Sequence, residues 1–375
     1  KGEKNYIGFP QSGDEPQPDL MFNGSFGKIW DFLPVLGYDD EQELQENRKR
    51  MEHGLPPLKS RMAQLTDKTA LEQSIHGTQA KYLKGKITIG TSEDQNPIAP
   101  GKLLRTWKQK KRVYRQYVIN HPGSSDWHMG SATFKEYSTE KLGITTTILA
   151  SPKHPFSVDL YQDALGNSIA FLNKNLSMYP YEEIRVAEIP FYQEKFYALP
   201  NLIAISEKQG WYSDTSQINE RSYVYHTVTS QVFRQWIYSS LRIANVQGAH
   251  MIGDALPQAL GLQVIKEAIG EEGVQYILKR KQDFYNTERH KEPNTEKPLL
   301  YADNAYYLEK HKGVIALYEV MDIVGFEKFN NFLVQWMNEN PQKPKRFIDF
   351  YHKLLERLPE NKKMTIKVKF ETIEY

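Results

Sequence analysis

The fold of this chain is decided by the stretch Tyr223-Val-Tyr-His-Thr-Val-Thr-Ser-Gln-Val-Phe-Arg-Gln-Trp-Ile-Tyr238. Its apolar residues recur at helical spacing, which predicts a helix over residues 219–241. Four aromatic side chains in it are expected to be core residues rather than parts of a ligand box: Tyr223, Tyr225, Phe233 and Trp236. The polar residues on the same helix are therefore the first candidates for a catalytic or metal-binding site.

Composition narrows the class of protein. The chain has 375 residues, a length typical of a protein with more than one domain. Of these residues 39% are hydrophobic and 25% are charged, which is typical of a globular protein. The formal charge of +2 gives no global field that would recruit nucleic acid, so no nucleic-acid partner is expected. The absence of cysteine excludes disulfides, zinc–cysteine sites and thiol catalysis. No stretch reaches the roughly 20 apolar residues that a membrane-spanning helix needs.

One basic run, Trp107-Lys-Gln-Lys-Lys-Arg-Val-Tyr-Arg115, allows two interpretations. It could be a phosphate-binding patch, or a charged hairpin with a solvated outer face. The second interpretation is favoured, because runs of like charge are most often solvated.

Residues 1–150 are rich in turn signals, which predicts a β-rich domain in the form of a β-sandwich. The strand candidates are Lys86–Gly90, Val113–Ile119, Ala132–Tyr137 and Ile144–Leu149. A charged segment, Glu41–Met51, predicts a helical insert at the surface.

Residues 151–375 are predicted to form a second, mostly helical domain. A helix is expected over Phe156–Leu176, followed by strands at Ile184–Ile189 and Asn201–Ile205. Further helices are expected over residues 219–241, 252–269, 271–286, 304–323, 326–338 and 344–357. This order of elements indicates an α+β fold. The last run, Met364–Tyr375, alternates like a strand and has no closing turn, so the chain is expected to be a piece of a longer protein.

Several different short motifs are spread over nearly the whole chain: Phe32-Leu-Pro-Val-Leu-Gly-Tyr38, His53-Gly-Leu-Pro-Pro57, Ile98-Ala-Pro-Gly101, Pro200-Asn201 with Ser206-Glu207, Ala244-Asn-Val-Gln-Gly-Ala249, and Lys312-Gly313 with Leu317-Tyr318. Together they resemble the gluzincin aminopeptidases, the aminopeptidase N family. The similarity is greatest to the bacterial subgroup in which the peptidase domain is fused to a transporter permease. The resemblance implies a β-rich N-terminal domain followed by a thermolysin-like catalytic domain.

The family's zinc helix carries H-E-x-x-H, in which two histidines bind the metal and the glutamate is the general base. Aligned on the following Gln235-Trp236 pair, the histidine positions hold Ser230 and Arg234, and the base position holds Gln231. Arginine stays protonated and offers only hydrogen-bond donors, so it cannot bind zinc. Glutamine cannot take a proton from water.

The remaining family positions are also changed. The third zinc ligand, a glutamate on the next helix, falls on Asp254, and the oxyanion-stabilising tyrosine falls on Lys310. The glutamate that grips the substrate's amine falls on Ala198. Arg234 could pair with Asp254 and replace the ion by an internal salt bridge. No cofactor is then expected.

Two functions follow from these positions. The first is a catalytically inactive aminopeptidase-like module that binds a protein or peptide partner. By resemblance, it would belong to a membrane transporter complex or cell-envelope assembly at the extracytoplasmic (periplasmic) face of a bacterial membrane. The alternative is an active zinc metallopeptidase with displaced ligands, for which His226, His250 and Asp254 are the candidates. In that case zinc would be the cofactor.

Overall fold

The structure is a computed structural model, which describes residues 20–21, 24–29, 44, 47–56, 62–75, 84–120, 127–153, 155–189, 196–290 and 296–373. The motif at 32–38 and residues 41–43, 45 and 46 of the expected insert at 41–51 lie outside these residues. Within the insert's range a short helix, α1 (Asn47–Glu52), is present. A second short helix, α2 (Lys68–Glu72), begins at Asp67, whose carboxylate accepts hydrogen bonds from the Thr69 and Ala70 N–H groups at 3.0 Å.

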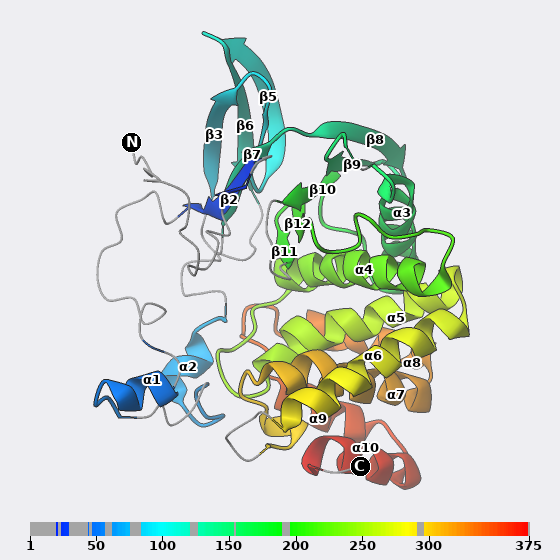
Figure 1. The fold of residues 1–375 in the computed structure, drawn as a ribbon. Coiled ribbons are helices and arrows are strands. Elements are labelled where there is room, and N and C mark those ends of the chain that lie inside the picture. Colours follow the sequence, from blue (N-terminus) through cyan, green and yellow to red (C-terminus); the bar gives the residue numbers. More distant parts are fainter. Residues whose placement is uncertain are drawn as a thin grey trace.

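The N-terminal part contains two antiparallel sheets (Figure 1). The first has the order β1-β2-β7-β4: β1 (Leu20–Met21), β2 (Gly24–Lys28), β7 (His128–Ala132) and β4 (Asn96–Ile98). The second has the order β3-β6-β5: β3 (Gly85–Ser92), β6 (Arg112–Ile119) and β5 (Lys102–Gln109). The expected strand at 132–137 is instead the end of β7 and the start of β8, because the chain turns between them.

A five-stranded sheet, of order β11-β12-β10-β9-β8, joins the two halves of the sequence. Its strands are β8 (Lys135–Lys141), β9 (Ile144–Ala150), β10 (Glu183–Ile189), β11 (Phe196–Leu199) and β12 (Leu202–Ser206). Strand β9 pairs in parallel with β10, and β11 pairs antiparallel with β12 as the edge strand beside α4. The expected domain division after residue 150 therefore falls inside this sheet.

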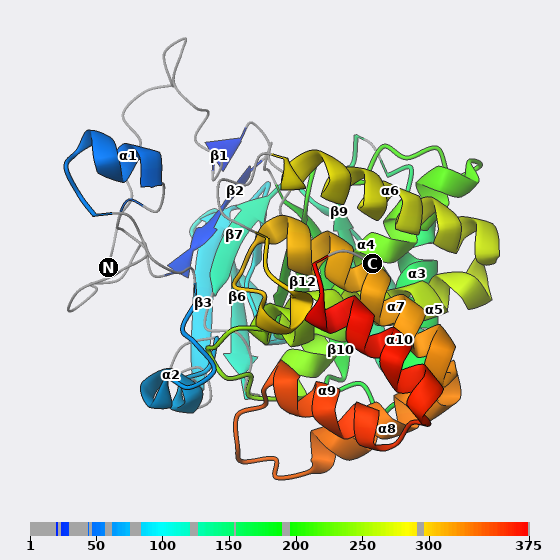
Figure 2. The same cartoon turned by 90° about the horizontal axis from the view of Figure 1, so that it is seen from below.

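A helical body follows (Figures 1 and 2). Its helices are α3 (Val158–Asn175), α4 (Ile218–Ser240), α5 (Leu256–Ala268), α6 (Glu271–Arg289), α7 (Gly313–Val324), α8 (Phe326–Asn338), α9 (Phe347–Glu356) and α10 (Glu360–Glu371), with a 3-10 turn at Leu299–Tyr301. Two π-helical turns precede α5 and α7: η4 (Met251–Ala255) and η6 (Leu308–Lys312). The sheets followed by this body confirm the α+β fold. None of the described helices combines the length and apolar character that crossing a bilayer requires.

The C-terminal run is helical, so its prediction as a strand was wrong. In α10, Ile366 and Phe370 stand four residues apart and are both buried. The Phe370 ring meets Phe347 and Tyr351 of α9 edge-on, at centroid distances of 5.4 and 5.7 Å. Burial of this i, i+4 pair outweighs the alternating pattern of lysines and apolar residues, because tertiary packing overrides local propensity.

Helix α4 runs through the centre of the main core. Val224, Val228, Val232 and Phe233 are fully buried there. Gln235 joins α4 to the sheet, since its Nε2 donates to the Leu199 carbonyl at 2.6 Å and its Oε1 accepts from the Tyr179 hydroxyl. The expected helix is confirmed, and its aromatic residues are partly or fully buried. One face of α4 packs on the sheet, and the opposite face meets α5 (Figure 1).

Candidate functional site

The candidate site lies where α4 approaches the π-helical turn η4 and helix α5. A glycine allows the close approach, because a Cβ atom added at Gly261 would stand 2.6 Å from the Thr229 hydroxyl oxygen. π-helical turns are rare, and they occur often at functional sites. Here η4 and η6 contact each other and carry Asp254 and Lys310, two of the predicted site residues.

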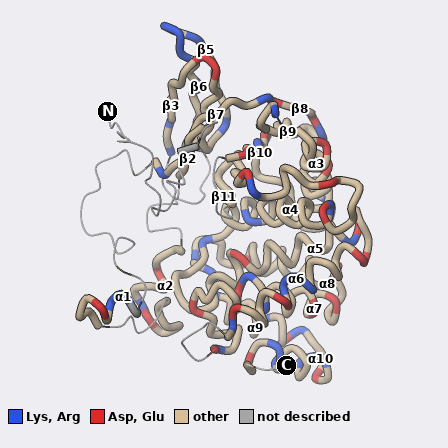
Figure 3. The backbone as a smooth tube through the Cα atoms, in the orientation of Figure 1, with Lys and Arg blue, Asp and Glu red and all other residues tan. Residues whose placement is uncertain are grey.

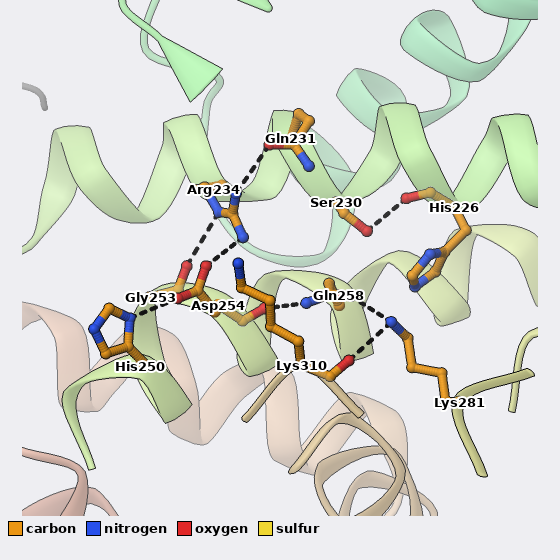
Figure 4. Close-up of polar contacts among 10 residues, drawn as sticks. All are labelled: His226, Ser230, Gln231, Arg234, His250, Gly253, Asp254, Gln258, Lys281 and Lys310. Carbon is orange, nitrogen blue, oxygen red and sulfur yellow. Dashed lines mark hydrogen bonds and ion pairs between the residues drawn. The ribbon is translucent and has the colours of Figure 1, made fainter. Parts of the chain in front are cut away.

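Arg234 and Asp254 form the central ion pair (Figure 4). One Nη of Arg234 donates to Oδ1 of Asp254, and its Nε donates to the Gly253 carbonyl at 3.3 Å. The second Nη donates to Oε1 of Gln231 at 3.2 Å. The two side chains of the ion pair are only 13% and 11% exposed. All three nitrogens of the guanidinium group are therefore engaged by protein oxygens in a site that is largely shielded from water.

His250 completes the group from the start of η4. Its Nδ1 lies 2.6 Å from Oδ2 of Asp254, so the carboxylate bridges an arginine and a histidine. Burial alone would raise the pKa of Asp254, but the charge of Arg234 and the hydrogen bond to His250 lower it far below its usual range. Burial alone would lower the pKa of His250, yet Asp254 raises it overall. The network therefore favours an ionised Asp254.

The other predicted residues on α4 are satisfied within the helix or its surroundings. The Ser230 hydroxyl donates to the carbonyl of His226, four residues earlier, so its hydrogen is directed to the backbone. Gln231 accepts from Arg234. Ala198 lies in β11 next to the carbonyl that anchors Gln235, and its methyl group cannot bind an amine.

A buried lysine adds a second cation below the ion pair. Lys281 of α6 donates to Oε1 of Gln258 at 2.6 Å and to the Lys310 carbonyl at 2.9 Å. Gln258 in turn donates to the Asp254 carbonyl at 2.9 Å, which connects the two cations (Figure 4). Burial, and after it the charges of Lys310, Arg280 and Arg234, lower the pKa of Lys281 to about 7. The Lys310 ammonium lies 4.8 Å from the ring centroid of Tyr306.

Two further titratable groups border the site on η6. The Glu309 carboxylate accepts from the Asn304 N–H at 2.7 Å, and burial raises its pKa to about 7. His311 stacks on Phe284 at a centroid distance of 4.6 Å, and burial with the nearby charges of Lys281 and Lys310 lowers its pKa to about 3. At neutral pH His311 is therefore an uncharged ring in an aromatic setting.

The alternative ligand set is only partly brought together. Asp254 contacts His250, but His226 lies at the opposite end of the group, beside Gln258 and Lys281 (Figure 4). Burial and the charge of Lys281 hold the pKa of His226 well below its usual range. No cluster of three or more His, Asp or Glu side chains in the described parts of the chain is placed to hold a metal ion.

Four further residues of the site were not predicted from the sequence: Lys281, Gln258, Glu309 and His311. For Lys281 a signal existed: it falls at helical spacing among the buried residues Val274, Ile277 and Tyr285 of α6. A lysine on the apolar face of a helix is unusual, since lysines are almost never fully buried without a partner. The other three had no comparable signal.

Comparison with known proteins supports the fold. No family model and no curated protein matches the sequence. Among solved structures, the M1 zinc metallopeptidase from Deinococcus radiodurans is similar, with a TM-score of 0.60 and 14% identity over 78% of this chain. A glutamate-to-alanine variant of that enzyme gives the same three values. The variant with a bound Tyr-Ser-Ala substrate has a TM-score of 0.55 and 13% identity over 77% of this chain.

This likeness establishes a shared fold and nothing finer, because the identity is so low. The chain matches 64%, 65% and 63% of those three structures, which is less than two thirds of their length. The expected gluzincin-like fold is thereby confirmed. The zinc that this fold binds in the M1 metallopeptidases does not suit the residues at the site. The guanidinium group of Arg234 cannot donate an electron pair to a metal, and it forms an ion pair with the carboxylate of Asp254.

Proposed function

We propose that this chain is a catalytically inactive M1-like module that binds a peptide or protein partner. The observation that carries the proposal is the ion pair between Arg234 and Asp254, two positions where the family resemblance places zinc ligands. A fixed positive charge at that place opposes the entry of a divalent cation. The nearby Lys310, whose charge lowers the pKa of Asp254, adds to the opposition.

Catalysis is further opposed by the groups around the ion pair. Gln231 cannot act as a general base, and its Oε1 is engaged by Arg234. Lys310 stands at the position of the oxyanion-stabilising tyrosine, and its backbone carbonyl accepts from Lys281. The site therefore lacks a metal ligand set, a base and the usual oxyanion donor at the family positions.

The partner follows from the resemblance to permease-fused peptidases. We expect a protein or peptide ligand in a membrane transporter complex or cell-envelope assembly, at the extracytoplasmic (periplasmic) face of a bacterial membrane. A fold built to take an extended chain can keep that use after its catalytic groups are lost. Identification of the flanking sequence of the gene product tests this location directly.

The alternative is an active zinc metallopeptidase in which His250 and Asp254 bind the metal. The observation in its favour is their contact at 2.6 Å, with i, i+4 spacing. For this reading Arg234 would have to release Asp254, and His226 would have to approach it. Both changes cost the contacts described above.

Metal analysis separates the two functions. The isolated protein is expected to contain no stoichiometric zinc, and chelator should leave its melting temperature unchanged. A real site would contribute its binding free energy to stability. Zinc near one atom per chain, together with a melting temperature that chelator lowers, would overturn the inactive reading.

Activity assays give an independent check. Aminopeptidase substrates should be cleaved only at background rates, with or without added zinc. Restoration by Ser230→His, Gln231→Glu and Arg234→His should still yield little activity, because catalytic groups that act as a unit are strongly non-additive. Turnover by the unmodified chain that chelator abolishes would favour the metallopeptidase.

A further inference from the structure

The sheet β3-β6-β5 carries a concentration of positive charge that the proposed function does not use. Its strands and the turn between β5 and β6 contain no Asp or Glu. They contain eight cations: Lys86, Lys102, Arg105, Lys108, Lys110, Lys111, Arg112 and Arg115. Because the whole chain has a formal charge of +2, the remainder of the chain has a net charge of −6.

Few of these cations are neutralised. Among the described residues, ion pairs involve only Arg115 with Glu136 and Lys102 with Glu182. Two carboxylates are present at the tip: Glu93 and Asp94, in the turn that follows β3. The other cations are exposed. Figure 3 shows blue segments at the hairpin tip, with a short red segment beside them, at an end that projects away from the helical body.

The outer face of this sheet also carries two aromatic rings. Trp107 of β5 pairs with Tyr114 of β6, and the two rings stack at a centroid distance of 5.2 Å. Gly90 of β3 makes room for this, because a Cβ there would stand 2.4 Å from the Tyr114 ring. The Arg105 guanidinium lies 4.6 Å from the Trp107 ring centroid.

Strand register places cations around the ring pair. Four cations lie on the same face as the rings: Lys86, Lys102, Arg105 and Arg112. Side chains alternate between the two faces of a sheet, and the register shift in β5 puts Lys102 back on the face that carries Arg105 and Trp107. The opposite face carries the buried Val113, Arg115 and Tyr117. The outer face is thus a solvent-facing surface of cations around two amphipathic rings.

We infer that this hairpin surface docks onto an anionic phospholipid membrane. Lys and Arg near such a surface each contribute about fivefold to the partition coefficient, and tryptophan and tyrosine prefer the membrane–water interface. The exposed Leu104, 47% accessible at the register shift of β5, adds apolar area. The tip is far from the helical body, so it can reach a surface first (Figure 1).

A nucleic acid fits this surface less well. Single-stranded binding relies on bases stacking on open aromatic faces. Here the rings stack on each other, and Arg105 covers Trp107. Base stacking would therefore have to displace a contact that already exists.

The hairpin turn allows a charge-removing variant that should fold well. Lys110 and Lys111 both have positive φ, 49° and 56°, as in a type I′ turn, for which Asn-Gly is the preferred sequence. Lys110→Asn with Lys111→Gly therefore removes two charges while suiting the backbone. The control is Lys279→Gln with Lys328→Gln, which removes two exposed charges from α6 and α8.

The test is co-sedimentation of the full chain with phosphatidylcholine vesicles, with and without phosphatidylglycerol. We expect binding only to the anionic vesicles, weakened by high salt, and reduced roughly 25-fold in the turn variant but not in the control. Equal loss in both variants, no binding to anionic vesicles, or tighter binding to DNA than to vesicles would each overturn the inference. It does not depend on whether the M1-like site is active.

Discussion

Arg234 on α4 and Asp254 in η4, twenty positions apart, form an ion pair that ties two segments of the helical body together. Each charge is compensated by the other in a site that excludes most water. Removing one partner should therefore cost up to about 3–5 kcal/mol of unfolding free energy, because it leaves a buried charge without its ion-pair partner, with His250 still in contact with Asp254. Arg234→Met and Asp254→Leu should each destabilise the protein, and the double variant should recover much of the loss.

A double-mutant cycle on denaturant unfolding measures this coupling. The matched control is the exposed pair Lys266–Glu271, at 3.1 Å, whose coupling should be no more than about 1 kcal/mol. If the effects at Arg234 and Asp254 were strictly additive, the two residues would not interact, and the explanation of the altered site would be wrong.

The second prediction concerns the pH dependence conferred by Lys281. Its pKa is about 7 in the folded protein, against 10.5 ordinarily. Between those values the unfolded chain binds more protons than the folded one, so stability should rise as pH increases from about 7 towards 10.5. The slope contributed by one group cannot exceed ~1.4 kcal/mol per pH unit.

Urea unfolding across that range should show the rise in the unmodified chain and in Lys279→Met, an exposed control on α6. It should be reduced in Lys281→Met, which has no charge to titrate. An identical pH profile in the two variants would mean that Lys281 stays protonated in the fold.

The third prediction tests the C-terminal helix. Phe370 is 1% exposed and packs against α9, so Phe370→Ala should cost about 3–5 kcal/mol. Met364, on the same helix, is 63% exposed, and Met364→Ala should change stability by no more than about 0.5 kcal/mol. Equal, small effects on the thermal midpoint would contradict the packing of α10.

The order of the elements could be predicted because most of them carry strong local patterns. Helix α4 shows apolar residues at helical spacing, and β6 alternates strictly between buried and partly exposed positions. Sheet membership could not be predicted in this way. Strands β8 and β9 look like their N-terminal neighbours in composition, but hydrogen bonds place them with β10.

The site was predictable only where a family position existed. Arg234 and Asp254 were placed by the resemblance, and the structure brings them into contact as expected. His250 was named as a possible metal ligand, whereas the structure shows it as a hydrogen-bond partner of Asp254. Lys281 and Glu309 come from segments with no such motif, and only three-dimensional packing brings them near the ion pair.

The last prediction concerns Glu309, whose pKa is raised by burial to about 7 from 4.5. The folded state then binds more protons than the unfolded chain between those values, so stability should fall as pH rises from about 4.5 to about 7. Glu309→Gln keeps an oxygen for the Asn304 N–H and removes the titration. His250 and Asp254 face Glu309, and the Glu309 charge raises the pKa of His250, so the difference between the two pH profiles reports Glu309 together with its coupling to His250. Relative to the unmodified chain, the variant should gain stability steadily across this window when unfolding is followed by denaturant. A constant difference at all pH values would show that the pKa of Glu309 is the same in the folded and unfolded states.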